Sequence, residues 1–222
     1  MNIMNKHFFT ISLIIFLATC YAQAQFNYGI RAGFNSTKIW QGKDNPTNMK
    51  LGLLFGAVAE YSVSDKFSIN PGLLFTTQGY KDQATVAWDG IDGGGTYKVK
   101  NIVNLNYIQI PIHICYKSDN RFLLWAGPYF GFAVGGNEKS KWFEDGKKHI
   151  FVHKLKFGGD DYSNYRIFDF GLNIGIAKQF GNIRIGLEGS NSLISTTKPS
   201  IYKNDGAYNF GIALTATYMF RK

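Results

Sequence analysis

Three histidines follow the N-terminal segment of the sequence, His113, His149 and His153, and an imidazole can bind a metal or act as a base. His149 and His153 are four residues apart, so one turn of a helix would place both rings on the same side, within reach of one metal ion. The residues between them, Ile150-Phe151-Val152, favour an extended strand instead. The sequence therefore predicts no metal site.

Nucleophilic catalysis by serine needs an adjacent base, and Ser190 or Ser192 could be combined with His113. The chain has no Gly-x-Ser-x-Gly elbow to present such a serine. Gly93-Gly94-Gly95 is similar to a phosphate loop in composition alone, because it lacks the lysine and the helix that follow in such loops. We expect no catalytic residues and no cofactor, so the chain is not predicted to be an enzyme.

The elements that carry these residues are predicted to be strands, because apolar side chains recur at every second position. From Phe26 to Phe34 the even positions are aromatic or aliphatic, whereas the odd positions are Asn, Gly or Arg. A period of two places alternate side chains on opposite faces of a strand. The same period recurs in segments 50–62, 67–78, 98–117, 166–180, 183–196 and 207–220, and segment 121–134 is apolar on both faces.

The connections between these segments alternate between short and long. The short ones are 63–66, 118–120 and 181–182, and the long ones are 37–49, 81–97, 136–165 and 197–206. Short turns on one side and long loops on the other are typical of a barrel that crosses a membrane. The predicted fold class is all-β, an eight-stranded antiparallel up-and-down transmembrane β-barrel, whose interior is filled by side chains.

Charged residues occur on the polar faces of these segments. In a transmembrane barrel the apolar face contacts lipid, so the polar face points inward, and buried charges need partners. We therefore predict an interior polar network with a structural role. Its members are Arg31, Glu60, His113, Asp169, Arg184 and Glu188.

The N-terminal segment resembles a secretory signal peptide. Lys6 and His7 precede an apolar run over 8–18 and the small-residue site Ala22-Gln23-Ala24. The run is too short for a membrane-spanning helix, which needs about 20 residues. We expect residues 1–24 to be cleaved as a signal peptide and residues 25–222 to form one barrel domain in the outer membrane.

Cysteine content and charge exclude other classes. Cys115 would be the single cysteine of the cleaved chain, so neither an intramolecular disulfide nor a cysteine metal cluster can form. The formal net charge is +9, but no basic helix or aromatic RNA-binding strand pattern accompanies it. We expect contact with outer-membrane lipid rather than nucleic acid.

Two neighbouring strand motifs resemble those of the PorT-like outer-membrane β-barrel family. They are Asn106-Tyr107-Ile108-Gln109-Ile110-Pro111-Ile112 and Trp125-Ala126-Gly127-Pro128-Tyr129-Phe130-Gly131. Glycine-rich alternation from Phe170 to Gly175 and the closing Tyr218-Met219-Phe220 also fit. The resemblance extends over essentially the whole cleaved chain and implies an outer-membrane barrel, but its motifs are strand and turn features that imply no activity.

The longest connection, 136–165, combines lysines with aromatic residues. We expect an interaction surface there, formed by Lys141, Trp142, Phe143, Lys147 and Lys148. An envelope protein or a surface glycan could bind it, and the barrel itself is expected to be a monomer. Alternation within 150–157 suggests that the flanking strands extend beyond the membrane as a hairpin.

The predicted function is an integral, non-enzymatic outer-membrane barrel whose loops serve interaction or envelope support. Two alternatives stay open at this point. One is an outer-membrane enzyme that modifies lipid or peptide. The other is a secreted, lipocalin-like ligand-binding barrel, because alternation alone does not tell the inner face from the outer face.

Overall fold

The computed structural model describes residues 26–41, 47–88, 95–144, 147–158, 165–197 and 206–220. The predicted signal peptide, 1–24, lies outside them. The strands are β1 (Phe26–Gln41), β2 (Asn48–Ser62), β3 (Phe67–Trp88), β4 (Gly95–Lys117), β5 (Phe122–Glu144), β6 (Lys147–Lys154), β7 (Phe168–Phe180), β8 (Ile183–Ser192) and β9 (Ala207–Phe220). Within the described residues, no helix is long and apolar enough to cross a membrane.

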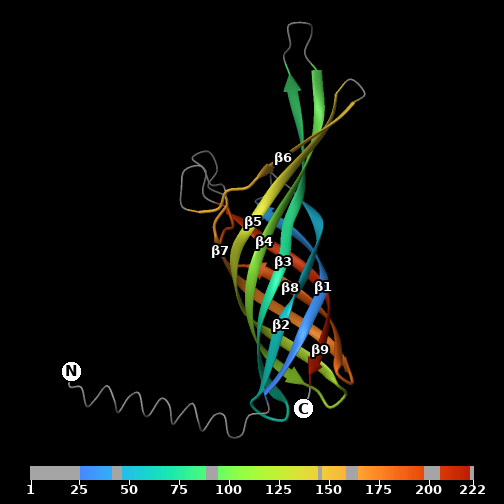
Figure 1. Cartoon of the computed structure of the whole chain (residues 1–222), viewed down its shortest axis with the longest axis vertical. Helices are drawn as coiled ribbons and strands as arrows, with labels where there is room; N and C mark the ends of the chain where they lie inside the picture. The colour runs from blue at the N-terminus through green and yellow to red at the C-terminus, as the bar shows by residue number, and fades with distance from the viewer. Residues whose placement is uncertain are drawn as a thin grey trace, which may run out of the picture.

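Eight of these strands form a closed ring (Figure 1). The pairing order is β4-β3-β2-β1-β9-β8-β7-β5-β6, and β4 also pairs with β5, which closes the ring and leaves β6 outside it. Every neighbouring pair is antiparallel. The predicted eight-stranded up-and-down barrel is confirmed, and β6 is an additional strand attached to β5.

The apolar face of the barrel points outward. On β1, Phe26 and Phe34 are 59% and 67% exposed, whereas Arg31 and Asn35 are 7% and 6% exposed. The same alternation continues along β7, β8 and β9. An outward apolar surface suits lipid, because a lipocalin would bury that face around its ligand. The lipocalin-like alternative is therefore wrong.

The short turns all lie at one end of the barrel, together with the first and last described strand ends (Figure 1). Gly181-Asn182 joins β7 to β8, and Gly181 has φ 58°, a left-handed conformation that glycine adopts without steric cost. Arg121, beside the β4–β5 turn, is the one described non-glycine residue with positive φ. The opposite end carries the long connections and is therefore the extracellular end.

Two of the predicted long loops are largely β structure. β3 and β4 stay paired from Leu74↔Gln109 up to Trp88↔Gly95, far into the predicted loop 81–97. β5 runs to Glu144 and pairs with β6 from Asn137↔Lys154 to Glu144↔Lys147. The expectation of a loop was wrong for 81–88 and 95–97, because strand pairing continues where the residues become polar. The suggestion that the strands flanking 136–165 extend as a hairpin is confirmed by the β5–β6 pairing.

The orientation of β5, which the sequence left open, is set by its neighbours and by a bulge. Trp125 and Tyr129 point inward and are 8% and 1% exposed. Between Ala133 and Gly135 the register with β4 shifts by one residue. An extra residue in one strand reverses which side chains face outward beyond it. Above the bulge the odd-numbered residues of β5 consequently share the outer face of the wall.

Candidate functional site

The centre of the barrel interior is occupied by an ion pair between β1 and β8. Arg31 Nη2 lies 2.9 Å from Glu188 Oε2, and both side chains are 7% exposed. Trp125 Nε1 donates to the same oxygen at 2.8 Å. His113 Nε2 lies 3.9 Å from that oxygen and 3.2 Å from the Asn173 amide nitrogen. The structure brings Arg31, Glu188 and His113 together, as partners of one another and of Trp125.

A second ion pair lies closer to the short turns. Arg184 Nη2 is 2.6 Å from Glu60 Oε2, which joins β8 to β2 across the ring. Arg184 also donates through Nε to the Gln179 side-chain oxygen at 3.3 Å. Arg184 and Glu188 are four residues apart on one strand, so their Cα atoms lie about 13 Å apart along it.

Asp169 occupies a third level, toward the extracellular end. It is 1% exposed and accepts hydrogen bonds from Ser192 Oγ at 2.8 Å, Tyr129 Oη at 3.2 Å and Asn209 Nδ2 at 3.2 Å. No cation contacts it among the described residues. Hydrogen-bond donors rather than a counter-charge therefore compensate the carboxylate.

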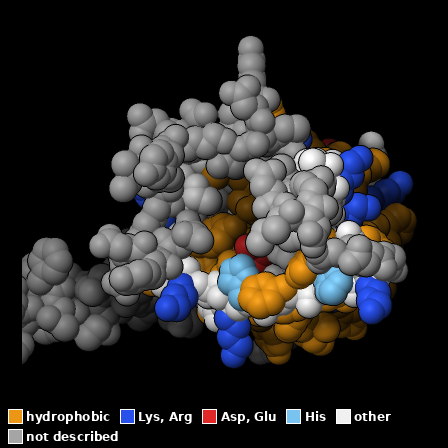
Figure 2. Space-filling view, turned by 90° about the horizontal axis from the view of Figure 1, so that it is seen from above, with side chains coloured by type: hydrophobic (Ala, Val, Ile, Leu, Met, Phe, Trp, Pro, Cys, Tyr) orange, Lys and Arg blue, Asp and Glu red, His pale blue; other side chains and the backbone are white. Residues whose placement is uncertain are grey.

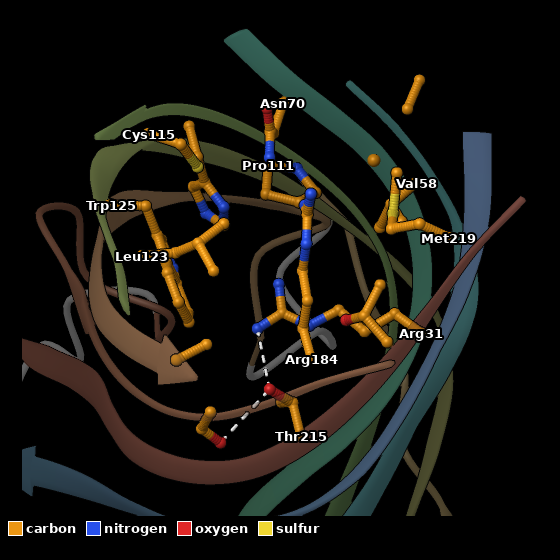
Figure 3. A pocket seen from close by; sticks show the side chains of 16 residues that line it. Arg31, Val58, Asn70, Pro111, Cys115, Leu123, Trp125, Arg184, Thr215 and Met219 are labelled. Atoms are coloured by element: carbon orange, nitrogen blue, oxygen red, sulfur yellow. Dashed lines mark hydrogen bonds between the residues drawn. The ribbon is translucent and has the colours of Figure 1, made fainter. Parts of the chain in front are cut away.

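A small cavity remains around Arg31, Arg184, Trp125, His113 and Cys115 (Figure 3). Its volume is about 50 Å³, room for very few water molecules. Ligand sites for small organic molecules span roughly 300 to 1,000 Å³. The cavity is therefore too small for a substrate or a solute path.

The serine and histidine combination considered from the sequence does not form. Ser192 bonds to Asp169 and Tyr129, whereas His113 bonds to Asn173, and both Ser192 and His113 are buried. Ser190 points its hydroxyl at the Gly211 carbonyl, 3.5 Å away. Within the described part of the chain neither serine is hydrogen-bonded to His113, so this serine–histidine pair does not form.

The paired histidines of the long connection lie on strand β6. His149 stacks on Trp142 with ring centres 5.3 Å apart, and His153 Nε2 lies 3.7 Å from Glu138 Oε2. Four residues along a strand span about 13 Å, too far for both rings to reach one ion. Over the described ranges, no group of three or more His, Cys, Asp or Glu residues could hold a metal.

The predicted interaction surface is divided between two faces of the β5–β6 hairpin. Trp142 is paired with His149, and Phe143 with Lys148. Since neighbouring residues alternate, Lys141, Phe143 and Lys148 share the outward face, and Trp142 shares the inward face with Lys147. The five predicted residues are thus not one patch.

Several interior residues were missed by the sequence reasoning. Trp125 and Tyr129 lie in a segment that is apolar on both faces, so their inward direction was not evident. The signal was present in the partner strands: a Cβ on Gly175 would lie 2.2 Å from the Trp125 ring, and one on Gly171 would lie 2.5 Å from the Tyr129 ring. A glycine opposite an aromatic residue marks the face on which that ring needs space.

Solved structures with a similar course of the chain were found at low sequence identity. Ail, the attachment invasion locus protein of Yersinia pestis, in complex with the heparin analogue sucrose octasulfate, is 10% identical with a TM-score of 0.45, covering 88% of this chain and 99% of that chain. Neisserial surface protein A is 10% identical with a TM-score of 0.42, covering 87% and 97%. OprG from Pseudomonas aeruginosa is 11% identical with a TM-score of 0.34, covering 88% and 96%.

No curated protein matches the sequence. A family model does: the model described as outer membrane protein beta-barrel domain matches residues 21–220, nearly the whole chain. The match agrees with the closed antiparallel ring, the outward apolar face and the short turns at one end. The chain therefore belongs to the outer membrane protein beta-barrel domain family and is an integral protein of the outer membrane.

Proposed function

We propose that this barrel is a non-conducting, non-enzymatic protein whose extracellular strands bind a partner at the cell surface. One observation supports it above the others: side chains from opposite walls meet inside the barrel. The Arg31 guanidinium lies 5.5 Å from the centre of the Trp125 ring, although β1 and β5 stand four places apart in the ring of eight. A wall-to-wall contact of this kind supports a closed interior.

Further interior layers support the same closed state. Toward the extracellular end, Ile39, Val103, Leu105 and Tyr107 form an apolar cluster with at most 2% exposure each. Above Asp169, the hydroxyls of Tyr80 and Tyr165 are 3.1 Å apart. Charged layers and an apolar layer thus follow one another along the barrel axis.

Conductance measurements test this part of the proposal. The purified protein is reconstituted in a planar bilayer, with an open porin as the positive control. We expect no stable conductance steps at neutral pH. Reproducible single-channel steps in the folded, unboiled protein would overturn the non-conducting proposal.

The absence of enzymatic activity is proposed from the positions of the candidate groups. Ser192 and His113 are 1% and 4% exposed and have separate partners. The Asp169 cluster is likewise buried, so no described nucleophile and base meet at an accessible surface. Lipid hydrolysis by the purified barrel, absent from a His113→Gln variant that still folds, would contradict this.

The partner is proposed to bind the region 136–165, and a surface glycan suits it better than an envelope protein. Lys147, Lys148 and Lys154 of β6 are exposed, and Phe143, Ile150, Phe151 and Val152 are exposed beside them. Lysines bind acidic groups, and aromatic rings pack on sugar faces. The ring is complete within one chain, which supports a monomer.

A glycan-binding assay with a shortened hairpin tests the partner proposal. Glu138 and His153 are direct cross-strand partners, so 139–152 can be replaced by a two-residue turn. We expect the intact barrel to retain an immobilised acidic polysaccharide and the shortened barrel to lose that binding. Equal binding by both folded proteins would reject this region as the site.

The finer assignment to the PorT-like branch is also proposed. It rests on the motif from Tyr107 to Pro111, both of which are fully buried inside the barrel. Pro111 lies opposite Gly72, where an added Cβ would be 3.1 Å from the proline ring. The motif therefore has a packing role in this barrel.

A further inference from the structure

The barrel wall continues beyond the membrane as four paired strands. We call this part the ribbon and define it as residues 81–88 of β3, 95–104 of β4, 137–144 of β5 and 147–154 of β6. Its register is continuous across all three strand pairs. Figure 1 shows these strands rising from one side of the barrel as a direct extension of its wall. The outer face of the wall thereby becomes the outer face of the ribbon.

Cross-strand pairing shows which side chains share that outer face. One row runs Gln83↔Lys100↔Lys141↔Ile150, and the next row toward the membrane runs Lys81↔Ile102↔Lys139↔Val152. By the same alternation Lys98, Lys148 and Lys154 lie on this face. The acidic side chains Asp82 and Glu138 belong to the opposite face, in rows with Asn101 and His153.

The outer face is consequently basic without local compensation. Lys100 and Lys141 are directly opposite one another, an arrangement in which like charges destabilise a sheet. No ion pair joins an outward lysine of the ribbon to a carboxylate within the described residues. Figure 2, which views this end from above, shows Lys and Arg side chains spaced around its edge. An external anion would relieve the repulsion.

The position of these lysines relative to the lipid identifies the anion. On β4 the outward side chains change from the isoleucines 108–114 through Asn106, Asn104 and Ile102 to Lys100 and Lys98. Eight residues separate Ile108 from Lys100, about 27 Å along a strand and roughly 20 Å along the membrane normal at the usual tilt. The headgroup layer of a phospholipid leaflet is only about 5 to 8 Å thick.

We propose that the outward lysine face of the ribbon binds the phosphate groups on the saccharide headgroup of lipopolysaccharide in the surrounding outer leaflet. This inference deepens the proposed function by assigning a lipid-anchored glycan to one face of the binding region. The lysines lie on the same outward side of the wall as the apolar side chains that contact lipid, but farther from the centre of the membrane. An anion that binds them therefore extends upward from a lipid beside the barrel. Lysine ammonium groups are strong point-charge donors to phosphate oxygens.

A binding titration with matched lysine variants tests the proposal. The full-length folded barrel in neutral detergent is titrated with rough lipopolysaccharide that carries its phosphates, and binding is followed by calorimetry. The test variant is Lys100→Gln/Lys139→Gln/Lys141→Gln. The control is Lys66→Gln/Lys117→Gln/Lys178→Gln, which removes the same charge from the short-turn end of the barrel. Heat-dependent electrophoretic mobility verifies that every variant is folded.

We expect the test variant to bind at least about tenfold more weakly, because each lysine near an anionic surface contributes roughly a fivefold gain. The control should stay within about twofold of the unmodified protein. The charge-preserving variant Lys100→Arg/Lys139→Arg/Lys141→Arg should retain binding. Equal losses in the test and control variants, or no loss in either, would overturn the proposal.

Titrations with other ligands distinguish phosphate anchored to a lipid from phosphate or acidic groups in solution. Dephosphorylated lipopolysaccharide should bind as weakly as the test variant does. Inorganic phosphate should not compete at equal phosphate concentration, and a soluble acidic polysaccharide, which binds the same region without a lipid anchor, should compete only partly at equal acid concentration. If the soluble polysaccharide competes fully, the ligand is not a lipid beside the barrel, and the glycan-binding proposal still stands. If the protein with the shortened hairpin binds every ligand like the intact protein, the glycan-binding proposal itself is wrong.

Discussion

Arg31 on β1 and Trp125 on β5 meet in the middle of the barrel, where both contact the same oxygen of Glu188. The guanidinium therefore has an ion-pair partner and an aromatic face at once. A cation held over an indole ring gains most where water is excluded. This three-residue contact joins opposite walls and makes the interior a rigid layer.

Replacing Arg31 by methionine should destabilise the barrel by about 3 to 5 kcal/mol, because Glu188 would be left buried without its cation. The measurement is the shift in the denaturant midpoint of the folded protein in detergent micelles. The Glu188→Gln change alone should be milder, since the amide oxygen can still accept from Trp125.

The double variant Arg31→Met/Glu188→Gln is the informative comparison. It removes both charges and retains an acceptor for the indole N–H, so it should be more stable than Arg31→Met alone. If the destabilisation of the double variant equals the sum for the two single variants, Arg31 and Glu188 are not energetically coupled. The conclusion that they act as one unit would then be wrong.

Gly175 on β7 should not tolerate alanine. An added Cβ would lie 2.2 Å from the Trp125 ring, which is held in place by Glu188 and cannot easily move aside. Overpacking of this kind costs about 1 to 3 kcal/mol. Gly189 on β8 is the matched control, because the nearest atom to its added Cβ is 3.9 Å away. Equal unfolding midpoints for Gly175→Ala and Gly189→Ala would contradict the packing argument.

The strands and the direction of most of their side chains could be predicted from the sequence, because apolar residues at every second position indicate a strand with one apolar face. Arg31, Glu60 and Arg184 all point inward from positions that alternation alone indicates. Their partners could not be predicted. Arg31 pairs with Glu188 and Arg184 with Glu60 because of the ring closure and strand stagger, and neither is visible in a local pattern.

The extracellular part was harder to predict, for two physical reasons. Strand pairing beyond the membrane needs no apolar face, so polar stretches such as 81–88 are similar to loops in composition. The bulge near Gly135 then reverses the direction of the following residues, and a one-residue shift moves every later side chain to the other face. Neighbouring residues such as Lys141 and Trp142 always lie on opposite faces of a strand, and the bulge decides that Lys141 is the one that faces outward.

Asp169 should be more sensitive to substitution than its lack of a cation suggests. Asp169→Ala leaves the donors of Ser192, Tyr129 and Asn209 without their acceptor inside the barrel. Each buried polar group left without a hydrogen bond lowers stability by about 1 to 3 kcal/mol, and by less where it can find another partner. The unfolding midpoint of Asp169→Ala should therefore fall clearly below that of Asp65→Ala, which alters an exposed turn. Indistinguishable midpoints would show that the Asp169 cluster contributes little to stability.

Removal of the hairpin tip should leave the barrel intact. β6 pairs with β5 alone, so the variant that replaces 139–152 by a two-residue turn loses, within the ring of eight, only the three outermost β4–β5 pairs, from Lys100↔Lys141 to Ile102↔Lys139. Antiparallel pairs β4–β5 and β5–β7 remain closed below the bulge. The variant should keep the difference in electrophoretic mobility between unboiled and boiled samples, at a transition temperature close to that of the intact protein. A barrel that unfolds without the hairpin would mean that β6 stabilises the ring closure, and binding losses in the shortened protein could then no longer be assigned to the ribbon.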